Sequence, residues 1–200
     1  MFTRILLNTF GILFFLFIFW KKLKEDYTST NTFSTALYIL FGIGVFNILA
    51  NRFLPQWWFW LDFLGASLGF ALGVMRFKFR FFESLEAAVV ALLPWLSLVF
   101  LGDAVLNSNL SSLIGSLVLL LIVVFYIFLD THYKKFTWYK SGKVGFAGLI
   151  TLGALFLIRI AVAVMFPFVL SFSGSIDSII SGVIAFTSFL LVFNLASQET

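Results

Sequence analysis

The run LSSLIGSLVLLLIVVFYIFL, residues 110–129, contains no charged side chain and no proline. A helix needs about 20 mostly apolar residues to cross the hydrocarbon core of a bilayer. Six further segments have a similar length and composition. The seven expected spans cover residues 2–20, 33–52, 57–75, 85–102, 110–129, 144–167 and 178–196. The sequence therefore predicts an all-α, polytopic integral membrane protein whose single domain, residues 1–200, is a seven-helix transmembrane bundle.

The composition supports a membrane protein and excludes several kinds of chemistry. Apolar residues make up 62% of the chain and charged residues 11%, with a mean hydropathy of +1.08. A soluble domain is about 45–50% apolar and roughly 25% charged. There is no Cys and one His, His132, so thiolate chemistry and two-histidine metal sites are excluded within one chain. We expect no metal, no cofactor and no nucleic-acid partner, because the distribution of the net charge of +4 fits membrane topology.

The basic residues indicate which way the chain crosses the membrane. Of the 13 Lys and Arg residues, ten follow the first, third and fifth spans: Lys21, Lys22, Lys24, Arg76, Lys78, Arg80, Lys134, Lys135, Lys140 and Lys143. Cytoplasmic loops carry an excess of Lys and Arg. The N-terminus is therefore expected outside and the C-terminus in the cytoplasm. Trp57, Trp58 and Trp60, at the outer end of the third span, are expected to anchor it at the interface.

Arg159 is the most informative single residue, because it lies inside the sixth span with apolar neighbours on both sides. A charged side chain at the centre of a span costs at least about 2.5–3.5 kcal/mol on insertion scales, and such residues mark functional sites. At 1.5 Å per residue from Val144, Arg159 lies about 22 Å from the cytoplasmic end of its span. It is therefore expected in the outer leaflet.

The same arithmetic brings other polar side chains to a similar depth: Asn8, Asn47, Asn51, Asp62, Asp103, Asn107 and Asn109. Asp62 and Asp103 are the two expected counter-ions of Arg159. A guanidinium binds phosphate well through paired hydrogen bonds, so a lipid phosphate is one expected ligand. The alternative is an Arg that snorkels to the headgroups or pairs with one Asp to fix helix packing.

Small residues at fixed spacing indicate close helix contacts. Gly65-Ala-Ser-Leu-Gly69 is a small-xxx-small pattern, which lets two membrane helices approach closely, and Gly42 and Gly44 are expected to act similarly.

The order of these features resembles the prolipoprotein diacylglyceryl transferase family over nearly the whole chain. The resemblance rests on Lys21-Lys-Leu-Lys-Glu-Asp26, on Phe63-Leu-Gly65-Ala-Ser-Leu-Gly69 and on Lys140-Ser-Gly-Lys-Val-Gly-Phe-Ala-Gly-Leu149, which leads into the span that contains Arg159. Arg159 corresponds to an essential arginine in a late span of the family. The chain departs from the family at Leu64, where the family has His, and near Asp103, where it has Arg.

The resemblance implies transfer of a diacylglyceryl group from phosphatidylglycerol to the cysteine of a lipoprotein signal peptide, in the bacterial cytoplasmic membrane. It implies catalytic roles for Arg159 and Asp103, substrate-binding roles for Asp62, Asn47, Asn107 and Gly65, and a membrane phospholipid and a signal peptide as partners. The alternative is a catalytically inactive membrane protein that binds lipid or signal peptide, or a subunit of a complex. A solute transporter is less favoured, because the inner halves of the spans are nearly all apolar.

Overall fold

The computed structural model describes residues 2–136, 139, 143–165 and 175–197. Within them, every regular element is a helix. The long helices are α1 (Phe2–Leu23), α2 (Ser29–Phe53), α3 (Trp58–Phe77), α4 (Phe81–Asn107), α5 (Leu110–His132), α6 (Phe146–Met165) and α7 (Ser175–Ser197). Two short 3₁₀ turns, η1 (Pro55–Trp57) and η2 (Tyr133–Lys135), follow α2 and α5.

All seven long helices are long and apolar enough to cross a membrane, which confirms the predicted all-α architecture with seven candidate spans. Each expected span coincides with one helix, but several helices extend further into polar sequence. For example, α4 continues from the expected end at residue 102 to Asn107, and α7 begins three residues before the expected residue 178. Residues 166 and 167 of the expected sixth span lie outside the described residues.

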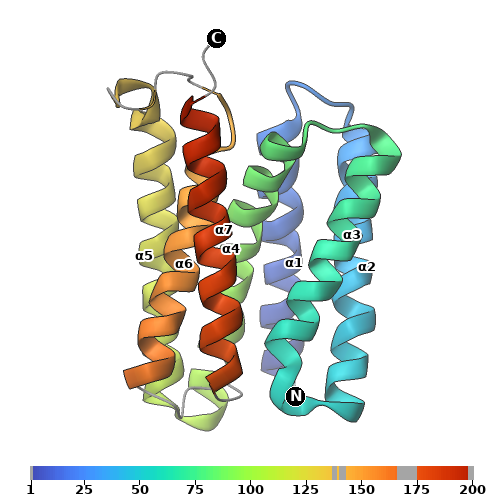
Figure 1. Ribbon diagram of the computed structural model, residues 1–200. Coiled ribbons are helices and arrows are strands. Elements are labelled where there is room, and N and C mark those ends of the chain that lie inside the picture. Colours follow the sequence, from blue (N-terminus) through green and yellow to red (C-terminus); the bar gives the residue numbers. More distant parts are fainter. Residues whose placement is uncertain (1, 137–138, 140–142, 166–174, 198–200) are drawn as a thin grey trace.

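α4 lies between two groups of helices, with α1, α2 and α3 on one side and α5, α6 and α7 on the other (Figure 1). It packs against α1, α3, α5 and α6. One buried apolar cluster joins α1 to α4, and another joins α4 to α7. Many large apolar side chains face outward; Phe41 and Phe193 are each 72% exposed. Such an apolar surface is stable in lipid, whereas a soluble protein would need to bury it.

The α2–α3 contact is a close approach of glycine backbones. A Cβ atom on Gly65 would lie 2.4 Å from the carbonyl oxygen of Gly42, and one on Gly69 would lie 2.2 Å from that of Tyr38. A side chain at either position would force the helices apart, so the expected packing role of the Gly65–Gly69 pair is confirmed. Gly44 differs, because a Cβ there would meet open space.

Successive helices run in opposite directions, which defines two ends of the bundle (Figure 1). The Arg159 end is where α3, α5 and α7 begin, and the Glu86 end is where α2, α4 and α6 begin. The polar residues that the sequence predicted at one depth all belong to the Arg159 end. The described Lys and Arg residues of the three basic loops belong to the Glu86 end.

Candidate functional site

Arg159 forms a buried ion pair with Asp177, which was not one of its expected counter-ions. Its Nη2 donates to Oδ1 of Asp177 on α7 at 2.8 Å, and the two side chains are 7% and 0% exposed. Asp62 and Asp103 were the expected counter-ions, and that expectation is wrong. Within the described residues, neither of them forms an ion pair with Arg159.

Two aromatic rings of α3 also lie against Arg159. The guanidinium carbon lies 3.8 Å from the ring centroid of Phe59 and 5.2 Å from that of Trp60. Trp60 Nε1 also donates a hydrogen bond to Asp177 Oδ1. Phe156 of α6 stacks on Trp60, with ring centroids 5.9 Å apart. Three helices, α3, α6 and α7, therefore meet around one carboxylate and one guanidinium.

Trp60 differs from its expected role as an interfacial anchor. Its side chain is only 8% exposed, and its indole N–H is used by Asp177. A buried Trp requires a partner for this N–H group, and Asp177 provides one. Trp57 and Trp58 are half-buried. The anchoring interpretation is thus wrong for Trp60.

Asp62 and Asn47 do contact each other, across the α2–α3 contact. Asn47 Nδ2 donates to the two carboxylate oxygens of Asp62 at 2.9 and 3.2 Å. Asn51 Nδ2 donates in turn to Asn47 Oδ1 at 2.9 Å. This chain of hydrogen bonds stays within two helices and does not reach Arg159.

Asp103 organises the turn between α4 and α5. Its Oδ1 accepts from Asn107 Nδ2 at 2.7 Å, and its Oδ2 accepts from Asn109 Nδ2 at 3.3 Å and from the Ser112 hydroxyl. Asn109 also caps α5 by accepting from the backbone N–H of Ser111 at 3.1 Å. Asp103 therefore fixes a local turn with Asn107, the partner that the sequence placed nearby.

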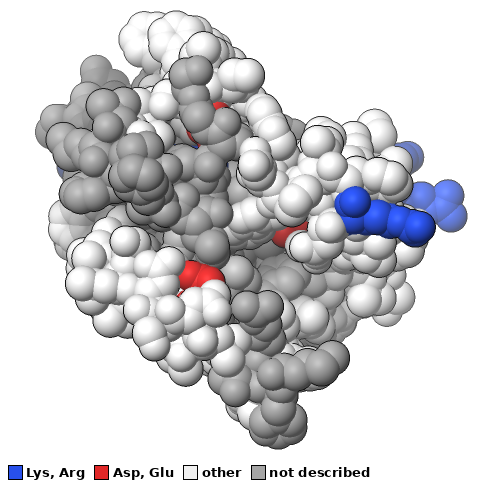
Figure 2. Space-filling model, turned by 90° about the horizontal axis from the view of Figure 1, so that it is seen from below, with Lys and Arg blue, Asp and Glu red and all other residues white. Residues whose placement is uncertain are grey.

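The predicted outer-leaflet residues thus share one end of the bundle but form separate groups. One contains Arg159, one Asp62 and Asn47, and one Asp103 and Asn107. A view onto the Arg159 end shows acidic atoms in recesses between other residues, and a group of Lys and Arg atoms at one edge (Figure 2). Gly65, a further predicted site residue, is buried in the α2–α3 contact.

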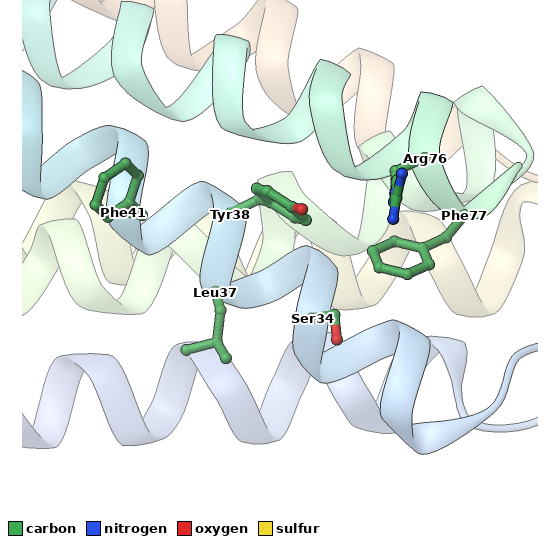
Figure 3. Close-up of a pocket in the computed structure, with 6 residues that line it drawn as sticks. All are labelled: Ser34, Leu37, Tyr38, Phe41, Arg76 and Phe77. Carbon is green, nitrogen blue, oxygen red and sulfur yellow. The ribbon is translucent and has the colours of Figure 1, made fainter.

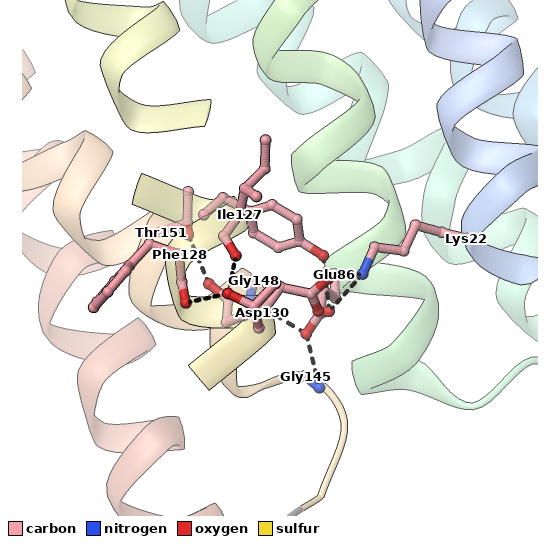
Figure 4. A network of polar contacts seen from close by, with 11 residues as sticks. Lys22, Glu86, Ile127, Phe128, Asp130, Gly145, Gly148 and Thr151 are labelled. Atoms are coloured by element: carbon pink, nitrogen blue, oxygen red, sulfur yellow. Dashed lines mark hydrogen bonds and ion pairs between the residues drawn. The ribbon is translucent and has the colours of Figure 1, made fainter. Parts of the chain in front are cut away.

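A second buried polar network lies at the Glu86 end and was missed. Glu86 of α4 is 5% exposed. Its Oε2 accepts from the backbone N–H groups of Gly145 and Gly148 at 3.0 and 3.3 Å, and its Oε1 accepts from the Tyr126 hydroxyl at 2.9 Å (Figure 4). The first N–H groups of a helix have no partner within it. Glu86 therefore acts at the N-terminus of α6, although it was not among the predicted site residues.

Two glycines make this contact possible. Gly145 has φ = +110°, a conformation that side chains disfavour. A Cβ on Gly148 would lie 2.6 Å from the Cα of Glu86. The segment Gly145-Phe-Ala-Gly148 therefore lets α4 approach the start of α6 closely enough for the carboxylate to reach two backbone N–H groups.

Lys22 extends the network to α1 and α5. Its Nζ lies 2.8 Å from Asp130 Oδ2 and 3.5 Å from Glu86 Oε1, and 5.0 Å from the ring centroid of Tyr126 (Figure 4). Lys22 and Asp130 are about a third exposed, at 29% and 32%. The cation thus lies at the edge of the network, while the carboxylate of Glu86 lies inside.

The loop between α1 and α2 adds a smaller polar contact at this end. The Tyr27 hydroxyl accepts from the Arg80 backbone N–H at 2.9 Å and donates to Glu83 Oε2 at 3.2 Å. Burial raises the pKa of Tyr27 above its ordinary value of 10.0, so the phenol stays protonated at neutral pH. This contact ties the first loop to the start of α4.

In the part of the chain that the structure describes, no three His, Asp or Glu side chains are grouped so that they could hold a metal ion. No family model, curated protein or solved structure matches the chain. Fold and polar groups together define an all-helical protein with seven helices able to span a membrane and a buried charge cluster at each end of the bundle.

Proposed function

We propose that this chain is a multi-pass protein of the bacterial cytoplasmic membrane that transfers a diacylglyceryl group from phosphatidylglycerol to the cysteine of a lipoprotein signal peptide. The proposal takes the N-terminus as outside and the C-terminus as cytoplasmic, from the ten basic residues in alternate loops. The Arg159 end then lies in the outer leaflet.

The observation that carries the proposal is the buried guanidinium of Arg159 at that end. Phe59 stacks on it and Asp177 holds one of its nitrogens, so its orientation is fixed before a substrate arrives. A preorganised cation that meets developing negative charge is an effective source of transition-state stabilisation. A phospholipid phosphate would compete with Asp177 for the paired hydrogen bonds that guanidinium offers.

The proposed reaction forms one bond and breaks one. The cysteine sulfur of the peptide, as thiolate, bonds to the glycerol carbon of the diacylglyceryl group, and the bond from that carbon to the phosphate oxygen breaks. Glycerol phosphate leaves with the negative charge, which Arg159 stabilises. Asp103 is the proposed acceptor of the thiol proton. Asp62, Asn47 and Asn107 would contact the headgroup, and Gly65 keeps α2 and α3 close.

The test is an assay of diacylglyceryl transfer by the purified protein from phosphatidylglycerol to a synthetic signal peptide. Transfer is measured as the increase in mass of the peptide. We expect transfer by the wild type and a loss of at least about 100-fold for Arg159→Ala, as when a main electrostatic stabiliser is removed. Arg52→Ala is the matched control, because Arg52 is exposed near the same end. Absence of transfer from every anionic lipid tried would contradict the proposal.

A second candidate is a catalytically inactive protein that binds phospholipid or signal peptide, alone or as part of a complex. The neutralisation of Arg159 by Asp177 and its 7% exposure favour this candidate, as does Leu64 at the position of the family's His. It predicts that phosphatidylglycerol co-purifies with the wild type and with Arg52→Ala but is lost from Arg159→Ala, without any transfer to peptide.

A further inference from the structure

A shallow groove on the α2–α3 surface lies near the Glu86 end, far along the helices from Arg159. Its volume is about 430 Å³, and it is lined by Ser34, Leu37, Tyr38, Phe41, Arg76 and Phe77 (Figure 3). Four of these residues have the spacing i, i+3, i+4 and i+7 on α2, which places them along one face of the helix. The other two come from the last turn of α3.

The groove carries its polar groups at one end, beside the Phe77 ring, and is apolar at the other end. Figure 3 shows the Tyr38 hydroxyl and the Arg76 guanidinium toward the same end as Ser34, while Phe41 lies at the opposite end. Leu37 and Phe41 are 59% and 72% exposed, so they offer an open apolar wall. The polar end is the one nearer the bundle end from which the basic loops project.

The three polar side chains of the groove have no partner among the described residues. Arg76 forms no ion pair there, and neither the Ser34 nor the Tyr38 hydroxyl forms a hydrogen bond. Tyr38 contacts Phe77 only through its ring, at 6.3 Å between centroids. Exposed basic and hydroxyl groups at the edge of a bilayer are free to bind an anionic lipid headgroup in place of water. A ligand with an anionic head and an apolar tail matches both ends of this groove.

We propose that the groove binds one anionic phospholipid of the leaflet at the Glu86 end. The lipid phosphate accepts hydrogen bonds from the Arg76 guanidinium and from the Tyr38 and Ser34 hydroxyls, and an acyl chain lies along Leu37 and Phe41. Basic sites between membrane helices commonly bind anionic headgroups in this way. The site is separate from Arg159 and does not depend on the proposed transfer reaction.

Native mass spectrometry of the purified protein, titrated with phosphatidylglycerol or phosphatidylcholine in detergent, tests the site. We expect Arg76→Gln to weaken phosphatidylglycerol binding about tenfold, as for loss of a charge-assisted contact. Tyr38→Phe keeps the ring contact with Phe77 and should weaken binding about threefold. Arg80→Gln is the matched control, because it removes the same charge from the neighbouring loop but does not line the groove; it should change binding less than about twofold.

Three outcomes would overturn the proposal. The first is an equal loss of binding in Arg76→Gln and Arg80→Gln, which would mean diffuse attraction to basic loops. The second is equal binding of phosphatidylcholine and phosphatidylglycerol, and the third is full displacement of the lipid by millimolar inorganic phosphate. If Arg76→Gln lowers the thermal midpoint in lipid-free detergent, its loss of binding could reflect instability, and Tyr38→Phe becomes the deciding variant. Unchanged binding of phosphatidylglycerol to Tyr38→Phe would then contradict the site.

Discussion

The two ends of the bundle each bury a carboxylate next to a cation, but they use the carboxylate differently. At the Arg159 end, the described partners of Asp177 include two side chains, those of Arg159 and Trp60, which donate to its carboxylate. At the Glu86 end, Glu86 accepts from two backbone N–H groups at the start of α6, as well as from Tyr126. Side-chain partners can be exchanged by mutation, whereas a backbone N–H group remains in every substitution except one to proline.

This difference separates a replaceable charge pair from a required one. A buried ion pair can often be exchanged for apolar residues of similar size without loss of stability, while removal of one partner is costly. Arg159 and Asp177 are such a buried pair, so we expect that apolar residues of similar size could replace both together. Glu86 does not, because its loss leaves α6 without an acceptor for its first N–H groups. A functional role for Arg159 would explain why a replaceable pair is kept. Four measurements of stability in detergent test whether the two ends differ in this way.

The largest effect is expected for Arg159→Met, which leaves the fully buried Asp177 carboxylate without its counter-ion. We expect a loss of about 3–5 kcal/mol in the free energy of unfolding. The double variant Arg159→Met/Asp177→Leu should recover at least about 2 kcal/mol of that loss, measured as a double-mutant cycle. A double variant no more stable than Arg159→Met would show that the pair is not coupled.

Glu86→Gln is expected to cost about 2–3 kcal/mol, because a neutral amide accepts more weakly and brings an N–H₂ group among donors. Adding Lys22→Met to Glu86→Gln should recover none of the lost free energy of unfolding, whereas the second substitution at the Arg159 end should recover part of it. Glu83→Gln, three residues earlier on α4 and half-buried, is the control and should have a smaller effect. Full recovery in Glu86→Gln/Lys22→Met would remove the difference between the two ends.

Trp60→Phe keeps an aromatic ring against Phe156 but removes the N–H donor of Asp177. We expect a loss of about 1–2 kcal/mol, the usual cost of a lost hydrogen bond to a buried charge. Trp57→Phe, at a half-buried position, should change the thermal midpoint less. Equal midpoints for the two variants would assign Trp60 to interfacial anchoring after all.

The smallest effect is expected for Lys22→Met. Lys22 and Asp130 are partly exposed, and Glu86 keeps three other donors. The loss should be below about 1 kcal/mol and should shrink as salt is added, because exposed ion pairs are weak and screened. A loss as large as that of Glu86→Gln would mean that the cation, rather than the backbone contact, stabilises the Glu86 end.

The sequence predicted more of the fold than of the site. Arg159 was singled out correctly as unusual, since a charge among apolar residues is costly wherever the helix packs. Asp177 was missed because the expected seventh span began at residue 178, which placed it in a loop. The helix begins at Ser175, and this shift of three residues puts Asp177 in the first turn beside Arg159.

Glu86 and Trp60 show a different limit. Both were visible in the sequence, but their partners are far along the chain: Glu86 contacts Gly145 and Gly148, and Trp60 contacts Asp177. A pattern of residues indicates that a side chain is polar or aromatic, but not which distant helix lies opposite it. Local rules therefore assigned Trp60 to the interface and did not single out Glu86.

The sequence by itself determined the class of the protein and the end of the bundle at which each polar residue lies. Both follow from the length of apolar runs and the alternation of direction along a chain that crosses repeatedly. Only the tertiary structure decided which charges meet, because an ion pair requires two helices to face each other within a few ångströms. That facing depends on close packing such as the α2–α3 glycine contact and the aromatic rings that join α3 to α6.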